Sequence, residues 1–233
     1  MPITALIAHA ALLASLTAPY PFAVGETLTY DAMLGYFPVG TATATVSRLA
    51  RERGKEAFVF EMTGEGGPPG IRVRYELTSW VGTGRFASLR FHRKVVQGRS
   101  VNEERYQIVP DSSRYREEGG AEDWEAPRDA LDELAFLYYL RTVPLAPGKS
   151  FTITRYFKTG YNPIQVRVTG RQEVTLPDGR TVPALAVELT SRGTTMGVRF
   201  TDDERRLPVE IDLPLPYGSV SLVLTSGAGG PPR

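Results

Sequence analysis

The chain has 233 residues, of which 42% are hydrophobic and 23% are charged, within the range of ordinary globular proteins. Its formal net charge of +1 provides no global field that would attract nucleic acid or an acidic membrane surface. The sequence contains no cysteine, which excludes disulfides, thiolate metal sites, cysteine nucleophiles and a lipid anchor on an N-terminal cysteine.

The first predicted element is the apolar run from Ile3 to Ala18. At roughly 16 residues it suits the hydrophobic region of a signal peptide better than a bilayer span of about 20. We therefore predict a signal peptide over residues 1–23 and a protein exported to the periplasm or beyond, in the bacterial envelope. A retained membrane anchor and a buried first helix are the alternatives. Export also disfavours nucleic acid as a partner, and after cleavage no integral membrane segment is expected.

Alternation of apolar and polar residues continues over most of the remaining chain, which predicts antiparallel strands with one apolar and one wet face. Turn signals such as Asp178-Gly179 separate the runs at hairpin spacing. We count roughly 11 to 13 strands, too many for a flat sheet, and predict a mainly β fold: a strongly curved antiparallel sheet or a partly open β-barrel. It forms a single domain over residues 24–225, followed by a disordered tail over 226–233. The inward positions that the alternation predicts are Ile71, Val73, Tyr75, Leu77, Ile164, Val166, Val168, Leu185, Val187, Leu189, Met196, Val198, Phe200, Leu207, Val209, Ile211, Leu213, Val220, Leu222 and Leu224.

One inserted helix is predicted over residues 129–141, DALDELAFLYYLR. Asp129 is the expected cap of the first backbone N–H groups, with Asp132 and Glu133 favourable near the positive end of the helix. Apolar residues cover almost the whole circumference, so the helix is expected to be buried, where it plugs or caps the curled sheet.

The segment from Asp202 to Arg206 resembles a catalytic carboxylate pair with arginine partners. It lies between two alternating strands, however, and Asp side chains commonly bond their own backbone in turns. A glycosidase needs two carboxyl groups facing each other across a cleft, which neighbouring residues at an exposed turn do not supply. We interpret this segment as a polar hairpin turn, with an acid–base pair as the alternative.

Histidine and metal signals point away from catalysis. Only His9 and His92 occur in the sequence, and His9 falls in the predicted signal segment. His92 alternates with Leu89 and Phe91 and is interpreted as a surface residue of a strand, with a triad base as the alternative. No zinc-ligand spacing, EF-hand or P-loop is present. We expect no catalytic residues, no cofactor and no metal site, although an oxygen-ligand cation site remains open.

Charge is segregated along the chain. Arginines and lysines dominate residues 70 to 99, while acids dominate residues 102 to 135. The first group could merge into a basic patch for anionic lipid heads or polysaccharide. The favoured alternative is that the two groups neutralise each other across adjacent strands. The candidate surface for a ligand or partner comprises Arg72, Arg74, Arg90, Lys94, Leu134 and Tyr138.

Three segments in this order resemble one bacterial family: PFAVGETLTYDAMLGYFPVGTATATV, DALDELAFLYYLR and FTDDERRLPVEIDLPLPYGSVSLVL. Together they are similar to the exported proteins catalogued as domain of unknown function 3108, over essentially all of the chain after the signal segment. Members commonly carry a tryptophan where Val198-Arg199-Phe200 stands here. The resemblance implies a mostly antiparallel β protein of the envelope with one inserted helix, and it carries over no catalytic residue.

Three functions are compatible with this sequence. The favoured one is a non-catalytic binding module whose curled sheet holds a lipid or other hydrophobic ligand, with the helix near the mouth of the cavity. The second is a structural or assembly factor that binds an envelope protein or glycan, in which case the interior should be filled by side chains. The third, a glycan hydrolase, requires two carboxylates to converge in a cleft from the set Asp129, Asp132, Glu133, Asp202 and Asp203.

Overall fold

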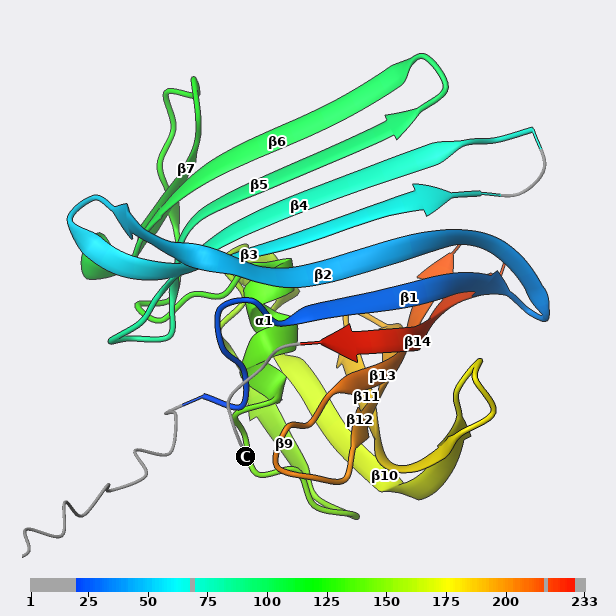
Figure 1. Ribbon diagram of the computed structural model, residues 1–233. Helices are drawn as coiled ribbons and strands as arrows, with labels where there is room; N and C mark the ends of the chain where they lie inside the picture. The colour runs from blue at the N-terminus through cyan, green and yellow to red at the C-terminus, as the bar shows by residue number, and fades with distance from the viewer. Residues whose placement is uncertain (1–19, 68–69, 216–217, 229–233) are drawn as a thin grey trace, which may run out of the picture.

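A 14-stranded antiparallel sheet dominates the computed structural model, which describes residues 20–67, 70–215 and 218–228 (Figure 1). The strand order across the sheet is β8-β7-β6-β5-β4-β3-β2-β1-β14-β13-β12-β11-β10-β9. The strands are β1 Thr27–Leu34, β2 Phe37–Glu52, β3 Lys55–Gly66, β4 Val73–Gly82, β5 Ser88–Gln97, β6 Ser100–Val109, β7 Arg114–Glu117, β8 Trp124–Glu125, β9 Ser150–Ile153, β10 Ile164–Thr175, β11 Thr181–Ser191, β12 Thr194–Thr201, β13 Pro208–Leu215 and β14 Gly218–Ala228.

Almost every pair of neighbouring strands is also consecutive in sequence, as expected for hairpin connections. The exception is β1 with β14, which pairs the start of the domain with its end. This pairing joins an N-terminal wing, β1 to β8, to a C-terminal wing, β9 to β14. The sheet curls but does not close, because β8 and β9 are its two free edges. The predicted curved antiparallel sheet is confirmed, and β7, β8 and β9 are too short for alternation to reveal them.

The period-two pattern correctly identified the inner face. In β10, Ile164, Val166 and Val168 are buried while their neighbours Gln165 and Arg167 are exposed. The same holds for the inward positions of β11 and for Val198 and Phe200 in β12. The pattern fails just before β4. Ile71 precedes this strand and is 45% exposed.

The helix α1 spans Glu133–Leu140, shorter than the predicted 129–141. Asp132, not Asp129, is its N-cap, and its Oδ1 accepts hydrogen bonds from the backbone N–H groups of Leu134 and Ala135. The helix cannot begin earlier because Leu131 is extended and pairs its backbone with the segment at Tyr156. Asp129 instead forms an ion pair with Arg155 at 2.8 Å.

Two 3-10 helices complete the secondary structure of the described residues: η1 Pro110–Ser112 and η2 Thr159–Tyr161. The chain between β9 and η2 packs against the N-terminal wing. There Phe157 is fully buried and its ring meets those of Phe91, Tyr106 and Tyr115 at 5.0 to 6.1 Å between centroids. This aromatic contact ties the C-terminal wing to β5, β6 and β7 without strand pairing.

The ends of the packed domain differ from the predicted boundaries. Phe22 is buried against Phe60 and Tyr138, so the predicted boundary of the signal segment at residue 23 cuts through packed residues. Strand β14 continues to Ala228, which pairs with Thr27, so the predicted tail from residue 226 begins too early. Most of the predicted signal peptide and the end of the predicted tail lie outside the described residues, and export stays a prediction.

Candidate functional site

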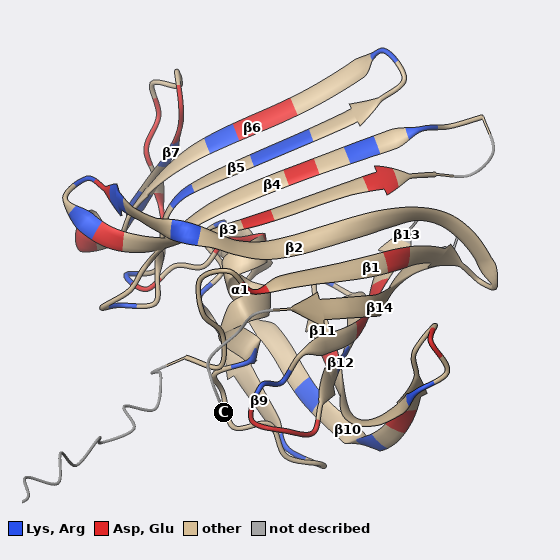
Figure 2. Cartoon of the chain, viewed as in Figure 1, with Lys and Arg blue, Asp and Glu red and all other residues tan. Residues whose placement is uncertain are grey.

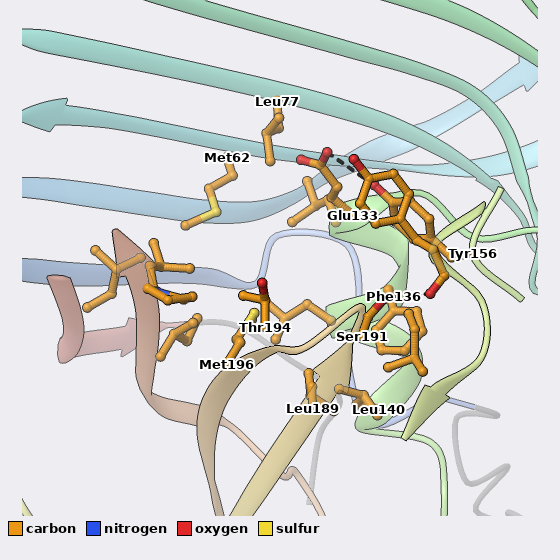
Figure 3. A pocket seen from close by; sticks show the side chains of 18 of the residues that line it. Met62, Leu77, Glu133, Phe136, Leu140, Tyr156, Leu189, Ser191, Thr194 and Met196 are labelled. Carbon is orange, nitrogen blue, oxygen red and sulfur yellow. Dashed lines mark hydrogen bonds between the residues drawn. The ribbon is translucent and has the colours of Figure 1, made fainter. Parts of the chain in front are cut away.

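An apolar cavity of about 470 Å³ lies between α1 and the curved sheet (Figure 3). Its walls come from one face of α1, from β3 and β4 of the N-terminal wing, and from β10 to β14 of the C-terminal wing. Its volume is within the range of about 300–1,000 Å³ that is typical of small-molecule sites. The cavity lining comprises Met62, Tyr75, Leu77, Glu133, Leu134, Phe136, Leu137, Leu140, Tyr156, Tyr161, Ile164, Leu189, Ser191, Arg192, Thr194, Met196, Ile211, Leu213, Pro214 and Leu222.

Most of this lining is aliphatic because the cavity is where the apolar faces of the two wings and the helix approach one another. Leu77, Leu189 and Leu222 are inward positions of the alternating strands. Met62 and Met196 stand on opposite wings (Figure 3), and their unbranched side chains can adapt to differently shaped occupants. The arrangement can therefore bury apolar surface, and each Å² removed from water contributes about 25 cal/mol.

A carboxylate, Glu133, marks the polar end of the cavity. The hydroxyl of Tyr156 donates to its Oε1 at 3.2 Å and that of Tyr75 donates to its Oε2 at 3.4 Å (Figure 3). Arg93 from β5 lies 3.5 Å from the same carboxylate. Burial and the charge of Glu133 both raise the pKa of Tyr156 and of Tyr75, so the two hydroxyls stay protonated donors.

A second ion pair extends this polar cluster away from the cavity. Lys158 contacts Glu104 at 3.3 Å, and its ammonium lies 4.5 Å from the ring centroid of Tyr106. The cluster thus links the segment before η2 with β6. It was not predicted, because Tyr156 and Lys158 belong to a segment without periodicity and Glu133 was considered only as a helix-start acid and as one of five hydrolase carboxylates.

At the other end of α1, Arg141 and Glu26 form a fully buried ion pair. The guanidinium donates to both carboxylate oxygens, at 2.6 and 3.0 Å, and also to the backbone carbonyls of Pro21 and Arg205. Arg205 also lies 3.6 Å from Glu26. Glu26, Arg141 and Arg205 come from the first, second and third of the segments that resemble the family. Such a two-pronged pair satisfies charges that would be costly to bury singly. Its role is to fix the N-terminal segment and the turn after β12 against the helix.

The helix cap Asp132 is also fully buried. Ser79 donates to its Oδ2 at 2.5 Å, and its backbone N–H donates to Ser88 at 2.8 Å. Burial raises the pKa of Asp132 to about 6, although hydrogen bonds from Ala135 and Ser79 act in the opposite direction. The side chain is enclosed by the protein and is absent from the cavity lining, so its contacts are those of a structural cap.

The acidic segment after β12 is a turn, as interpreted from the sequence. The Oδ1 of Asp203 accepts hydrogen bonds from Thr201 and from the backbone N–H groups of Arg205 and Arg206. Asp202 forms an ion pair with Arg171 of β10. Of the five carboxylates from which a hydrolase would need a converging pair, Glu133 alone lines the cavity, so no two of them face each other there.

The four basic residues of the predicted surface lie away from the cavity. Arg72 and Arg74 both contact Glu65, and Arg90 contacts Glu118 at 2.9 Å. Lys94 stands opposite Glu103 of β6 and Glu76 of β4 in the register. Figure 2 shows basic and acidic bands side by side across β3 to β6. The arrangement matches the favoured interpretation, in which these segments neutralise one another.

Leu134, Tyr138 and His92 lie in three different parts of the structure. Leu134 lines the cavity, whereas Tyr138 lies in the core, where its ring stacks on Phe60 at 4.0 Å between centroids. His92 faces away from α1 and its Nε2 lies 3.0 Å from Glu103, as expected for a surface position. Of the six residues predicted as a ligand or partner surface, the structure brings Leu134 alone into the cavity.

No group of three or more His, Cys, Asp or Glu side chains in the described residues is placed to hold a metal ion. Within the same ranges, no helix has the length and hydropathy needed to cross a bilayer.

Comparison with known proteins gives a family and a fold. The family model described as protein of unknown function (DUF3108) matches residues 29–225. No curated protein matches the chain. Among solved structures, the chain is similar to a crystal structure titled as a beta-barrel-like protein of domain of unknown function DUF1849 from Brucella abortus. That match has 10% sequence identity and a TM-score of 0.58, and it covers 87% of this chain and 96% of the other.

Proposed function

This chain belongs to the DUF3108 family of proteins of unknown function, and from its cavity we propose that it is a non-catalytic binding module for a lipid or other hydrophobic ligand. The observation that carries the proposal is the cavity of about 470 Å³ with its mainly aliphatic lining. Arg192 and Thr194 of its lining are exposed, so the cavity opens to solvent, and a concave, mainly apolar surface of this size with a few polar groups is typical of a ligand-binding site.

The proposed ligand is amphipathic, because the cavity combines an apolar body with a few polar groups. Aliphatic side chains of both wings would hold the chain of the ligand. Glu133, with the hydroxyls of Tyr75 and Tyr156, offers a carboxylate and two phenols at one end. At another point of the lining, Arg192 has an exposed guanidinium that forms no ion pair with any described residue. Its neighbour Tyr161 lies under it, 5.2 Å from guanidinium to ring centroid.

We place this binding in the bacterial envelope, on the basis of the apolar run Ile3 to Ala18. The alternative function, an assembly factor, predicts an interior filled by side chains. The cavity favours a ligand over that alternative, and the dispersed carboxylates disfavour a glycan hydrolase.

The test is native mass spectrometry of the full chain, purified without detergent from a bacterial host, followed by analysis of extracted lipids. We expect a bound lipid whose occupancy falls in Met196→Trp, because the larger indole takes up part of the cavity. The matched control is Met33→Trp, because Met33 lies in β1 and does not line the cavity. If the chain carries no lipid, or if both variants retain it equally, the proposal is wrong.

A further inference from the structure

Half of the large exposed hydrophobic side chains in the described residues gather at one end of the N-terminal wing. Tyr36 and Phe37 are 96% and 75% exposed in the turn between β1 and β2. Ile71 is 45% exposed in the connection between β3 and β4, and Val101 is 57% exposed where β6 begins. Isolated exposed hydrophobics are common on surfaces, but protruding aromatics grouped with aliphatic residues mark an interaction site.

The three turns are neighbours in space because the strand register places them so. Leu34 pairs with Phe37, Gly66 with Val73 and Gln97 with Ser100, and the β2–β3 and β4–β5 ladders align these ends. Figure 1 shows the turns projecting side by side from the same end of the wing. We call this set of residues, 35–38, 70–74 and 98–101, the hairpin edge.

The charge of the hairpin edge is positive. Arg72, Arg74 and Arg99 belong to it, and Figure 2 shows basic residues at the ends of β4 and β6. The nearby carboxylate of Glu65 is shared by Arg72 and Arg74, at 3.1 and 3.2 Å. The side chain of Arg72 stays 78% exposed in spite of this contact.

The two ends of these strands differ in the hydrophobic side chains that they expose. Arg53, in the turn between β2 and β3, donates to the backbone carbonyls of Leu89 and Ile108, and Lys55 contacts Asp111. Cationic side chains occur at both ends, but the two most exposed large hydrophobic side chains of the described residues, Tyr36 and Phe37, lie at the hairpin edge. The asymmetry gives the N-terminal wing one end suited to an external partner.

We propose that the hairpin edge docks onto the surface of a bilayer that contains anionic lipids. The exposed hydrophobic side chains of the hairpin edge belong to three separate strand ends and not to one flat sheet face. A bilayer interface accepts individual aromatic and aliphatic side chains, while arginines reach the lipid phosphates. The inference is independent of what the cavity binds, although docking would bring the protein to a source of hydrophobic ligands.

A single fluorescent probe tests the docking directly. The chain has no cysteine, so Ser100→Cys in the hairpin edge can be labelled at one position with an environment-sensitive dye. Ser112→Cys is the matched control, because Ser112 is exposed beyond the other end of β6. With vesicles of phosphatidylcholine and phosphatidylglycerol, the dye at position 100 should shift to shorter wavelength and the dye at 112 should not.

Substitutions in the labelled Ser100→Cys chain measure the contributions. Tyr36→Ser with Phe37→Ser should weaken vesicle binding by at least about tenfold, because two large apolar side chains lose their burial. Arg72→Gln and Arg99→Gln should each weaken it by about fivefold on anionic vesicles, and added salt should reduce binding of the parent chain. Leu49→Ser, an exposed residue elsewhere on β2, and Arg51→Gln are the controls. Residues 1–19 are common to all variants, so differences between them report on the edge.

Two results would overturn the proposal. The first is a dye response that is absent, or equal at positions 100 and 112. The second is a response at position 100 that depends on protein concentration without vesicles and accompanies dimer formation in sedimentation, since a second copy of the chain would then cover the hairpin edge. Lipid retention in the cavity is measured separately, so failure of docking leaves the proposed function standing, and the converse holds too.

Discussion

Replacement of the buried helix cap by its amide, Asp132→Asn, gives the sharpest pH-dependent prediction. The amide oxygen can still accept from the N–H groups of Leu134 and Ala135, and the amide N–H₂ can donate to the hydroxyl of Ser79. The variant therefore keeps the cap geometry and removes the ionisable proton. Only the pH-dependent part of the stability should change.

The sign follows from the raised pKa of Asp132, about 6 in the folded protein against an ordinary 3.8. The folded state binds the proton more tightly than the unfolded chain does. The stabilising contribution is fully present below pH 3.8 and is lost as the pH rises through about 6. The two pKa values correspond to about 3 kcal/mol, since one pKa unit is about 1.4 kcal/mol.

Urea unfolding of both proteins between pH 4 and pH 7 measures this contribution. The free energy of unfolding of Asp132→Asn relative to the parent should rise by up to about 3 kcal/mol across that range, because only the parent must ionise a buried carboxyl. Asp129→Asn, which removes a half-exposed carboxyl that does not cap the helix, is measured alongside for comparison. A difference in the free energy of unfolding between Asp132→Asn and the parent that stays constant from pH 4 to pH 7 would contradict this reasoning. It would show that burial does not penalise ionisation of the Asp132 carboxyl.

Three further substitutions test the contacts that hold the site. Arg141→Met should destabilise the protein by about 3–5 kcal/mol in urea unfolding, because it leaves the buried Glu26 carboxylate with Arg205 at 3.6 Å in place of its two-pronged partner; the double variant with Glu26→Gln should recover part of this loss, and a fully additive pair would contradict the coupling. Phe157→Ala should lower the free energy of unfolding by about 3–5 kcal/mol through the cavity left against the N-terminal wing, and a loss below 1 kcal/mol would show that this ring does not tie the wings together. Asp203→Ala should cost about 0.5–1.5 kcal/mol, because three turn donors lose their acceptor, and should leave lipid retention in native mass spectrometry unchanged; lost retention with an intact fold would give this residue a role in the site.

The strands were predictable because their signal is local. Alternation in β10 and β11 depends on whether each residue faces the core, so Val166 and Leu185 could be assigned without knowing their neighbours. The helix was predictable for the same reason, but its start was not. Asp129 and Asp132 are both good caps, and the choice was made by the backbone pairing of Leu131, which belongs to tertiary structure.

The site was hardly predictable, because it is assembled from segments far apart in the chain. Glu133 meets Tyr75 from β4 and Tyr156 from the segment before η2, and no spacing in the sequence indicates that they converge. The pair of Glu26 and Arg141 is separated by 115 positions. A signal did exist: Arg141 ends an otherwise apolar helix, and a cation expected to be buried requires a buried partner.

The most direct test of the central claim, that the cavity holds a hydrophobic ligand, is a methyl NMR titration of the full chain. The sequence has four methionines, of which Met62 and Met196 line the cavity and Met33 does not. With methionine methyl groups labelled, addition of a monomeric lysophospholipid should shift the signals of Met62 and Met196 in a saturable manner and leave that of Met33 in place. Signals of Met62 and Met196 that stay unmoved at saturating lipid, or that move no more than that of Met33, would contradict the account.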